Sequence, residues 1–188
     1  MKGETDMTNE ERFKDIFTTQ INRAGAAELL EWLESTDFFS APASTKFHGA
    51  YPGGLVEHSL NVYYALIADP SRPGLYPESR AICALLHDVC KANYYEPTEP
   101  GADGAPRYRV KDRFPFGHGE KSAFLIGRFM PLTDEEALAI RWHMGAYDDA
   151  ARGGSRTLSE AMSKSPLVYA LHAADMKATE DEKRRGRE

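Results

Sequence analysis

The sequence predicts a mostly all-α protein in a single domain, with one small β-hairpin inserted between helices. Apolar residues recur at helical spacing along most of the 188 residues. Two capping boxes mark helix starts, Thr8 with Glu11 and Thr133 with Glu136. One stretch, around residues 93–114, has strand character, with a turn rich in Pro and Gly at its centre.

Each expected element follows from a local pattern. Residues 1–44 carry two helices, which begin after Thr8 and at Ala26, and we expect them to pack on the core with their apolar faces. The turn Tyr51-Pro52-Gly53-Gly54 precedes the next helix. The helices after that turn are expected over residues 55–68, 78–92, 118–130, 133–144 and 165–179. The mixed charge run 180–188 is typical of a solvated tail.

Composition and charge exclude several classes of protein. The formal net charge is −6, whereas a surface that coats nucleic acid is basic overall. No apolar run approaches the length of a membrane span, and no signal-peptide pattern opens the chain. Cys83 and Cys90 are expected two turns apart on one helix, which is too far for a disulfide. These features predict a reduced, cytoplasmic protein with no membrane partner.

A polar pair interrupts the most apolar expected helix. His87 and Asp88 lie within Ala84-Leu85-Leu86-His87-Asp88-Val89, and buried charge has to be paired or bound to a metal. Lys91 follows Asp88 by three residues, on the same side of the expected helix. An ammonium group there is well placed to hold a phosphate oxygen. The alternative is an exposed lysine at a helix end, favoured by the helix dipole.

Several segments resemble the H…HD…D signature of the HD-domain metal-dependent phosphohydrolases. They are Gly53-Gly54-Leu55-Val56-Glu57-His58-Ser59, Leu85-Leu86-His87-Asp88-Val89-Cys90-Lys91 and Leu171-His172-Ala173-Ala174-Asp175. Two more histidines, His118 and His143, follow in the order seen in the two-metal members. The resemblance covers about residues 45–178 and implies that residues 45–179 form a single HD-domain helical bundle.

The segment from His48 to His58 is similar to the start of the HD domain in bacterial 3′–5′ exoribonucleases that join an OB fold to an HD domain. The first 45 or so residues of this chain are too few and too helical for an OB-type barrel. The cyclic-dinucleotide phosphodiesterases of the superfamily carry a Gly-Tyr-Pro triplet after the HD motif. Here Tyr51-Pro52-Gly53 comes before His58, in another order, so that substrate assignment is not supported.

The resemblance implies a site for two divalent metal ions. The implied ligands are His58, His87, Asp88 and Asp175 for the first ion, and Asp88, His118 and His143 for the second. Imidazole and carboxylate ligands suit Mn, Fe, Ni, Co or Zn, whereas Mg prefers oxygen alone. A metal-bound hydroxide is then expected to attack the phosphorus, with Asp88 and Lys91 as the catalytic residues.

Three further residues are candidates for substrate contact. His48 lies ten residues before His58 in an expected loop, where it either contacts substrate or anchors the loop. Arg109 and Lys111 belong to a row of basic residues that alternate along the expected strand of the hairpin, which puts them on one face. Such a row either contacts phosphate groups or protects a strand edge from aggregation.

The function expected from the resemblance is hydrolysis of a phosphomonoester or phosphodiester, with a nucleotide or a short nucleic acid as substrate. Two alternatives stay open. An HD-type di-iron oxygenase holds two irons with the same ligand order, and iron content with oxygen-dependent turnover would distinguish it. A non-catalytic nucleotide-binding module would bind its ligand without turnover. The oligomeric state is left open by the sequence.

Overall fold

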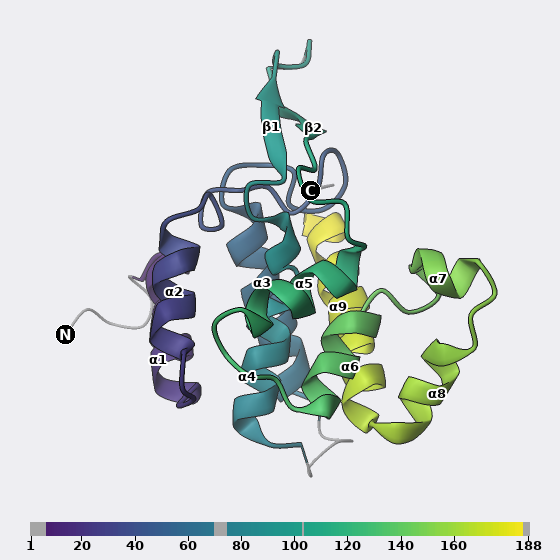
Figure 1. Ribbon diagram of the computed structural model, residues 1–188. Coiled ribbons are helices and arrows are strands. Elements are labelled where there is room, and N and C mark those ends of the chain that lie inside the picture. Colours follow the sequence, from purple (N-terminus) through teal and green to yellow (C-terminus); the bar gives the residue numbers. More distant parts are fainter. Residues whose placement is uncertain (1–6, 70–74, 103, 186–188) are drawn as a thin grey trace.

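The computed structural model describes residues 7–69, 75–102 and 104–185, and within these ranges the fold is mostly α-helical, as predicted (Figure 1). The helices are α1 (Asn9–Gln20), α2 (Ala26–Glu34), α3 (Gly54–Ile67), α4 (Pro77–Leu86), α5 (His118–Gly127), α6 (Asp134–Trp142), α7 (Asp149–Arg152), α8 (Thr157–Lys164) and α9 (Pro166–Arg185). The strands are β1 (Tyr95–Thr98) and β2 (Arg107–Val110). No helix in these ranges is long and apolar enough to cross a membrane.

Helix α3 lies at the centre of the bundle, and packs against α4 and α9. Helix α6 packs against α4 and α9 in turn, and α5 packs against α6 (Figure 1). Nine residues of α3 are buried, so this helix is apolar on most of its surface. One continuous hydrophobic core therefore joins α3 to the helices on both sides.

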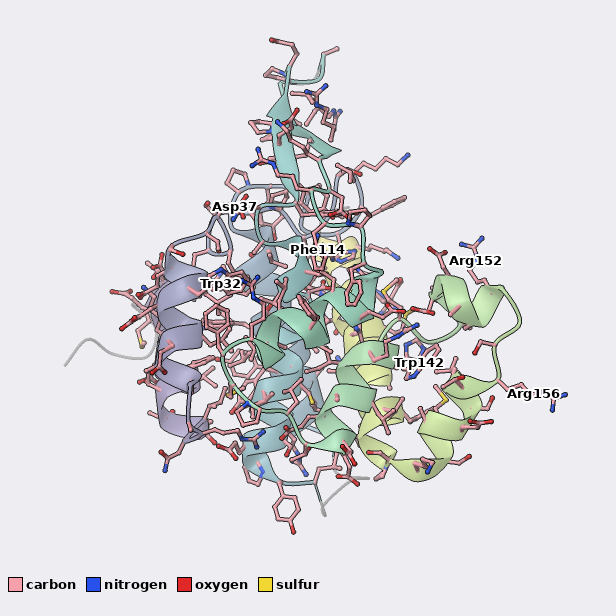
Figure 2. All side chains as sticks on the ribbon, in the orientation of Figure 1. Trp32, Asp37, Phe114, Trp142, Arg152 and Arg156 are labelled. Carbon is pink, nitrogen blue, oxygen red and sulfur yellow. The ribbon has the colours of Figure 1, made fainter. Side chains whose placement is uncertain are left out.

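The N-terminal helices belong to the same core. The capping box predicted at Thr8 is present: the Thr8 hydroxyl accepts the Glu11 N–H at 3.1 Å, and the Glu11 carboxylate accepts the Thr8 N–H at 2.8 Å. Phe13 and Phe17 point from α1 into the core. Figure 2 shows Trp32 on the inner side of α2, where its ring stacks on Phe129 with centroids 5.4 Å apart.

Helix α4 ends earlier than the sequence predicts. A continuous helix was expected as far as Ala92, but α4 stops at Leu86 and a 3₁₀ turn follows over Val89–Lys91. The His87 ring explains the break. Its Nδ1 donates to the Ala84 carbonyl at 2.9 Å, the group that a continuing helix would offer to the backbone N–H of Asp88.

The C-terminal segment departs most from the prediction. Helices α7 and α8 were not expected, and α9 continues through Arg185. Residues 180–185 therefore continue α9 instead of forming a frayed tail, and Glu182 is buried. Glu180, Arg184 and Arg185 are exposed, as expected of a solvated run, and residues 186–188 lie outside the described ranges. Ion pairs one turn apart, Lys177–Asp181 and Glu180–Arg184, support these last turns.

The predicted hairpin is present and projects from one end of the bundle (Figure 1). Its strands are antiparallel, with Tyr95 opposite Val110. The expected second strand is shorter than predicted, since pairing ends at Val110. At the base of the hairpin, the Asp37 carboxylate accepts the N–H of Asn93 at 2.5 Å, which ties the hairpin to the loop after α2 (Figure 2).

A buried ion pair connects the N-terminal segment to α6. The Glu136 carboxylate is fully buried and lies 2.5 and 3.0 Å from the two terminal nitrogens of Arg23. It also accepts the Ser79 hydroxyl at 2.7 Å. Burial opposes the charge, but these hydrogen bonds outweigh it and hold the pKa of Glu136 below its usual value.

We expect Arg23→Ala to lower the free energy of unfolding by about 3–5 kcal/mol, because it leaves a buried carboxylate unpaired. Urea denaturation at pH 7 measures this. Lys14→Ala, which removes two partly exposed pairs, with Glu10 and Glu34, is the control and should cost only about 1 kcal/mol. Since the folded pKa of Glu136 is depressed, its contribution is present above about pH 4.5 and is lost as the pH falls further. The difference in free energy of unfolding between Arg23→Ala and wild type could instead stay constant down to pH 3 or be absent at pH 7. Either result would contradict a stabilising buried ion pair between Arg23 and Glu136.

Candidate metal centre

Two helix ends place histidines in the same way. His87 caps the C-terminus of α4 and His143 caps that of α6. In each case Nδ1 donates to the carbonyl three residues earlier, Ala84 at 2.9 Å and Ile140 at 2.7 Å. A carbonyl oxygen only accepts, so Nδ1 carries the proton and Nε2 keeps its lone pair. The two rings lie with centroids 5.0 Å apart, near one end of the bundle core.

His58 supplies a third buried ring from the second turn of α3. Its Nδ1 lies 3.1 and 3.2 Å from the two carboxylate oxygens of Glu182. Its Nε2 lies 3.3 Å from His87 Nε2 and 3.2 Å from Asp175 Oδ1. Glu182 and Asp175 both come from α9, seven residues apart and hence on the same face.

The carboxylate of Asp88 lies between these rings and divides its two oxygens. Oδ1 is 2.7 Å from His118 Nε2 and 3.5 Å from His143 Nε2. Oδ2 is 3.6 Å from His87 Nε2 and 3.8 Å from His58 Nε2. Each oxygen therefore faces one pair of imidazoles.

The imidazoles of this cluster differ in their protonation states. Burial lowers the pKa of His87 to about 4, helped by the neighbouring imidazoles His143 and His58, so His87 is neutral at physiological pH. Burial also works against the charges of Asp88 and Asp175. Nearby Lys91 and the imidazoles nevertheless hold the pKa of Asp88 well below its usual value, and His58 does the same for Asp175. Burial opposes the charges of His58 and His118, but Asp175 and Glu182 raise the pKa of His58 to about 10, and Cys90 and Asp88 raise that of His118 to about 10. A metal ion would therefore displace a proton from each of these two rings, because neutral imidazoles and ionised carboxylates are the forms that bind a metal.

His118 is the most exposed of the rings, and two glycines position it. It opens α5 directly after Gly117, whose φ of 88° favours glycine. Gly119 lies so close to α6 that a Cβ atom there would come within 2.1 Å of the Arg141 carbonyl oxygen. Nδ1 of His118 lies 3.3 Å from the Cys90 thiol. The start of α5 is thereby held against the end of α6, beside Asp88.

A cavity of about 520 Å³ opens onto these groups. Lys91 lines it and lies 2.6 Å from Asp88 Oδ2. His48 lines it as well, with its ring centroid 4.8 Å from that of His58, and burial lowers the pKa of His48 to about 4. The other lining residues are Ala43, Ser44, Phe47, His58, Asp88, Tyr95, His118, Met144, Tyr147, Asp175, Met176, Thr179 and Lys183.

The structure brings together most of the residues that the sequence singles out. The six implied ligands lie in one cluster of overlapping groups, and Lys91 and His48 line the cavity beside it. Arg109 and Lys111 do not join them: both pair with Glu96 on the hairpin and neither lines the cavity. Cross-strand pairing accounts for this, because Glu96 stands directly opposite Arg109 in the register.

Sequence reasoning missed Glu182, Asn61 and Cys90. Glu182 is buried between the His58 ring and the Asn61 amide, which donates to it at 2.7 Å. The spacing of seven from Asp175 is the signal that could have found it, but only if the helix had been expected to continue past residue 179. Nothing in the sequence singles out Cys90 except its position in the segment from Leu85 to Lys91.

No protein family model, curated protein or solved structure matches the chain. Membership of the HD-domain superfamily therefore stays a prediction from motif order.

The donor set can hold metal ions. Groups of three donors lie within 4.8 Å of one another, among them His58, His87 and Asp88, and also Asp88, Cys90 and His118. His143 Nε2 is buried and forms no hydrogen bond with any described residue, which is costly unless a cation binds it. Imidazoles with Nδ1 bound to a carbonyl or carboxylate are typical of metal ligands. Histidine and carboxylate donors together suit a transition metal or zinc.

Glu182→Gln should weaken metal binding by about 10- to 100-fold, because Glu182 orients the His58 ring and increases its basicity. Competition with a chelating indicator measures the affinity of the purified protein for Mn²⁺ or Zn²⁺. Glu180→Gln is the matched control, since that side chain is exposed on the same helix and faces Arg184. Unchanged affinity in Glu182→Gln, with a wild-type thermal midpoint, would show that Glu182 does not support a metal ligand.

Proposed function

We propose that the protein is a metal-dependent phosphohydrolase that cleaves a phosphomonoester or phosphodiester. The observation that carries the proposal is the position of Asp88, whose two oxygens face two pairs of imidazoles at the base of a cavity lined by Lys91. A bridging carboxylate of this kind suits two cations side by side, and two-metal centres are well adapted to phosphoryl transfer.

The ligands fall into two sets that share Asp88. One set consists of His58, His87, Asp88 and Asp175, and the other of Asp88, His118 and His143. Bound there, divalent metals such as Mn, Fe, Ni, Co or Zn lower the pKa of coordinated water towards neutrality and neutralise charge on phosphoryl oxygens. The fixed Nδ1 hydrogen bonds of His87 and His143 keep the Nε2 atoms aimed at Asp88 without rearrangement.

Lys91 is suited to bind the phosphate. Its side chain is mostly buried in the cavity wall, and burial opposes its charge, but Asp88 raises its pKa above the ordinary value. Lys91 is therefore fully charged at neutral pH. An ammonium fixed in a cavity of low polarity stabilises the negative charge that develops on a phosphoryl oxygen much better than one in bulk water.

The remaining cavity wall favours a phosphate ester that carries a flat apolar group. Phe47, Tyr95 and Tyr147 line it together with two methionines. Aromatic side chains stack on nucleobases irrespective of sequence. A nucleotide combines a phosphate for Lys91 with a ring for these side chains, so a nucleotide or a short oligonucleotide is the substrate class that the cavity supports best.

The test is the metal content of the purified protein together with hydrolysis of bis(p-nitrophenyl) phosphate and p-nitrophenyl phosphate under added Mn²⁺. We expect about two metals per chain and metal-dependent release of nitrophenolate. Asp88→Ala should abolish turnover and lower metal content, while Asp15→Ala, an exposed residue of α1, should change neither. Normal turnover in Asp88→Ala would refute the assignment. Two irons without hydrolysis would instead support an oxygenase.

Lys91→Met should lower kcat/KM for bis(p-nitrophenyl) phosphate by about 10²- to 10³-fold, because it removes one charge that stabilises the transition state. Metal content should stay at the wild-type level, since Lys91 is not a ligand. Lys111→Met on the hairpin is the control and should hydrolyse the ester at the wild-type rate. A Lys91→Met variant that lost its metal as well would show that Lys91 acts by holding Asp88 in place.

A further inference from the structure

A second cavity of about 620 Å³ adjoins the metal cavity. The two share Phe47, His48 and Lys183 in their walls. The other residues that line the second cavity are Lys46, Gly49, Ala50, Tyr51, Glu57, Glu182 and Arg185. The two cavities are therefore neighbours on either side of Phe47 and His48.

The loop that separates the two compartments is fixed by its own hydrogen bonds. The Ser44 hydroxyl donates to the His48 carbonyl at 2.8 Å and accepts the Phe47 N–H at 2.8 Å. The Ala43 N–H donates to the Gly49 carbonyl at 2.8 Å. Gly49, with a φ of 57°, closes the loop against the start of α3. Lys46, Phe47 and His48 are thus presented at defined positions.

The charges in the second cavity favour an anionic ligand. Its two carboxylates are already engaged: Glu182 with His58, and Glu57 with Arg185 at 3.7 Å. Lys46 and Lys183 have no carboxylate partner in the described parts of the chain, and Lys46 lies over the Phe47 ring, 5.5 Å from its centroid. Among the described residues, the wall therefore holds two positive charges without a carboxylate partner, and one of them, Lys183, lines both compartments.

Each compartment also has exposed aromatic side chains. Phe47, shared by both, is 68% exposed, and Tyr51 in the second cavity is 41% exposed. Tyr147, which lines the metal cavity, is 62% exposed. Aromatic rings interleaved with unpaired cations are the arrangement by which proteins bind single-stranded nucleic acid, stacking bases and neutralising phosphates in turn.

We propose that the second cavity is a subsite for a further nucleotide, so that the preferred ligand is a single-stranded oligonucleotide of at least two nucleotides. This rests on the proposed function, because it places the scissile phosphate at Asp88 and Lys91. Lys46 and Lys183 contact the neighbouring phosphate, and Tyr51 stacks on the neighbouring base. Each cavity alone has the size of an ordinary small-ligand site, about 300–1,000 Å³, and the pair together exceeds it.

Calorimetric titration of the full chain in EDTA tests the subsite without turnover. The ligands are thymidine 5′-monophosphate and the 5′-phosphorylated dithymidylate and trithymidylate. We expect the dinucleotide to bind at least about 10-fold more tightly than the mononucleotide. Tyr51→Ala and Lys46→Met should each remove most of that gain while leaving mononucleotide affinity unchanged. Tyr51→Phe, which keeps the aromatic ring, should retain the gain in affinity for the dinucleotide. Tyr76→Ala should have no effect, because Tyr76 is exposed and lines neither cavity.

Equal affinity for mono- and dinucleotide would overturn the subsite, as would a gain that persists in both Tyr51→Ala and Lys46→Met. The proposed function fails separately. Hydrolysis of bis(p-nitrophenyl) phosphate without a length effect would reject the subsite alone. The protein could also bind the dinucleotide more tightly, lose that gain in Tyr51→Ala and Lys46→Met, and hydrolyse no phosphate ester. That result would support the subsite and reject the proposed hydrolase activity.

Discussion

Asp88 is only 2% exposed inside the bundle. A buried carboxylate is stable in its charged form only where positive charges or hydrogen-bond donors surround it. The surrounding structure supplies both. Lys91 approaches from the 3₁₀ turn, His118 from the start of α5, and His87 and His143 from two helix ends. Four separate elements thus end or begin at one point. The packing of α4 against α3, of α6 against α9, and of α5 against α6 and the 3₁₀ turn holds that point in place.

The two capping histidines show how local chemistry sets this geometry. A helix that continued past His87 would commit the Ala84 carbonyl to the backbone. The imidazole takes that carbonyl instead, ends the helix and fixes its own tautomer in one step. His143 does the same at Ile140, and its carbonyl in turn accepts the Nδ1 proton of His172 at 2.7 Å. At both positions, therefore, one hydrogen bond accompanies the end of the helix and orients the imidazole.

The structural features that were predicted correctly depend on residues close together in the chain. The features that were missed depend on contacts between residues far apart in the chain. The capping boxes at Thr8 and Thr133 are local, and both are present. The convergence of His58, His87 and Asp88 was expected from motif order, and the structure brings them together. Hydrophobic periodicity, however, takes no account of a side chain that competes for a backbone carbonyl, so the end of α4 was misplaced.

Glu182 illustrates the other limit. Within the run of charged residues from Glu180 onwards, nothing local separates a carboxylate bound to a buried imidazole from its solvated neighbours. Only the packing of α9 against α3, whose His58 lies 124 positions away in the chain, decides which carboxylate is buried. The basic residues of the hairpin show the converse, because Arg109 and Lys111 satisfy Glu96 beside them rather than the distant cavity.

Helix α9 links the two compartments through successive turns. Asp175 faces the imidazoles, Glu182 supports His58 from the other side of the ring, and Lys183 lines both cavities. The spacing of seven and eight residues keeps these side chains on one side of the helix over two turns. A shift of α9 along its axis would therefore move Asp175, Glu182 and Lys183 together. The charged final turns are consequently part of the site, and the ion pairs that keep them helical maintain its geometry.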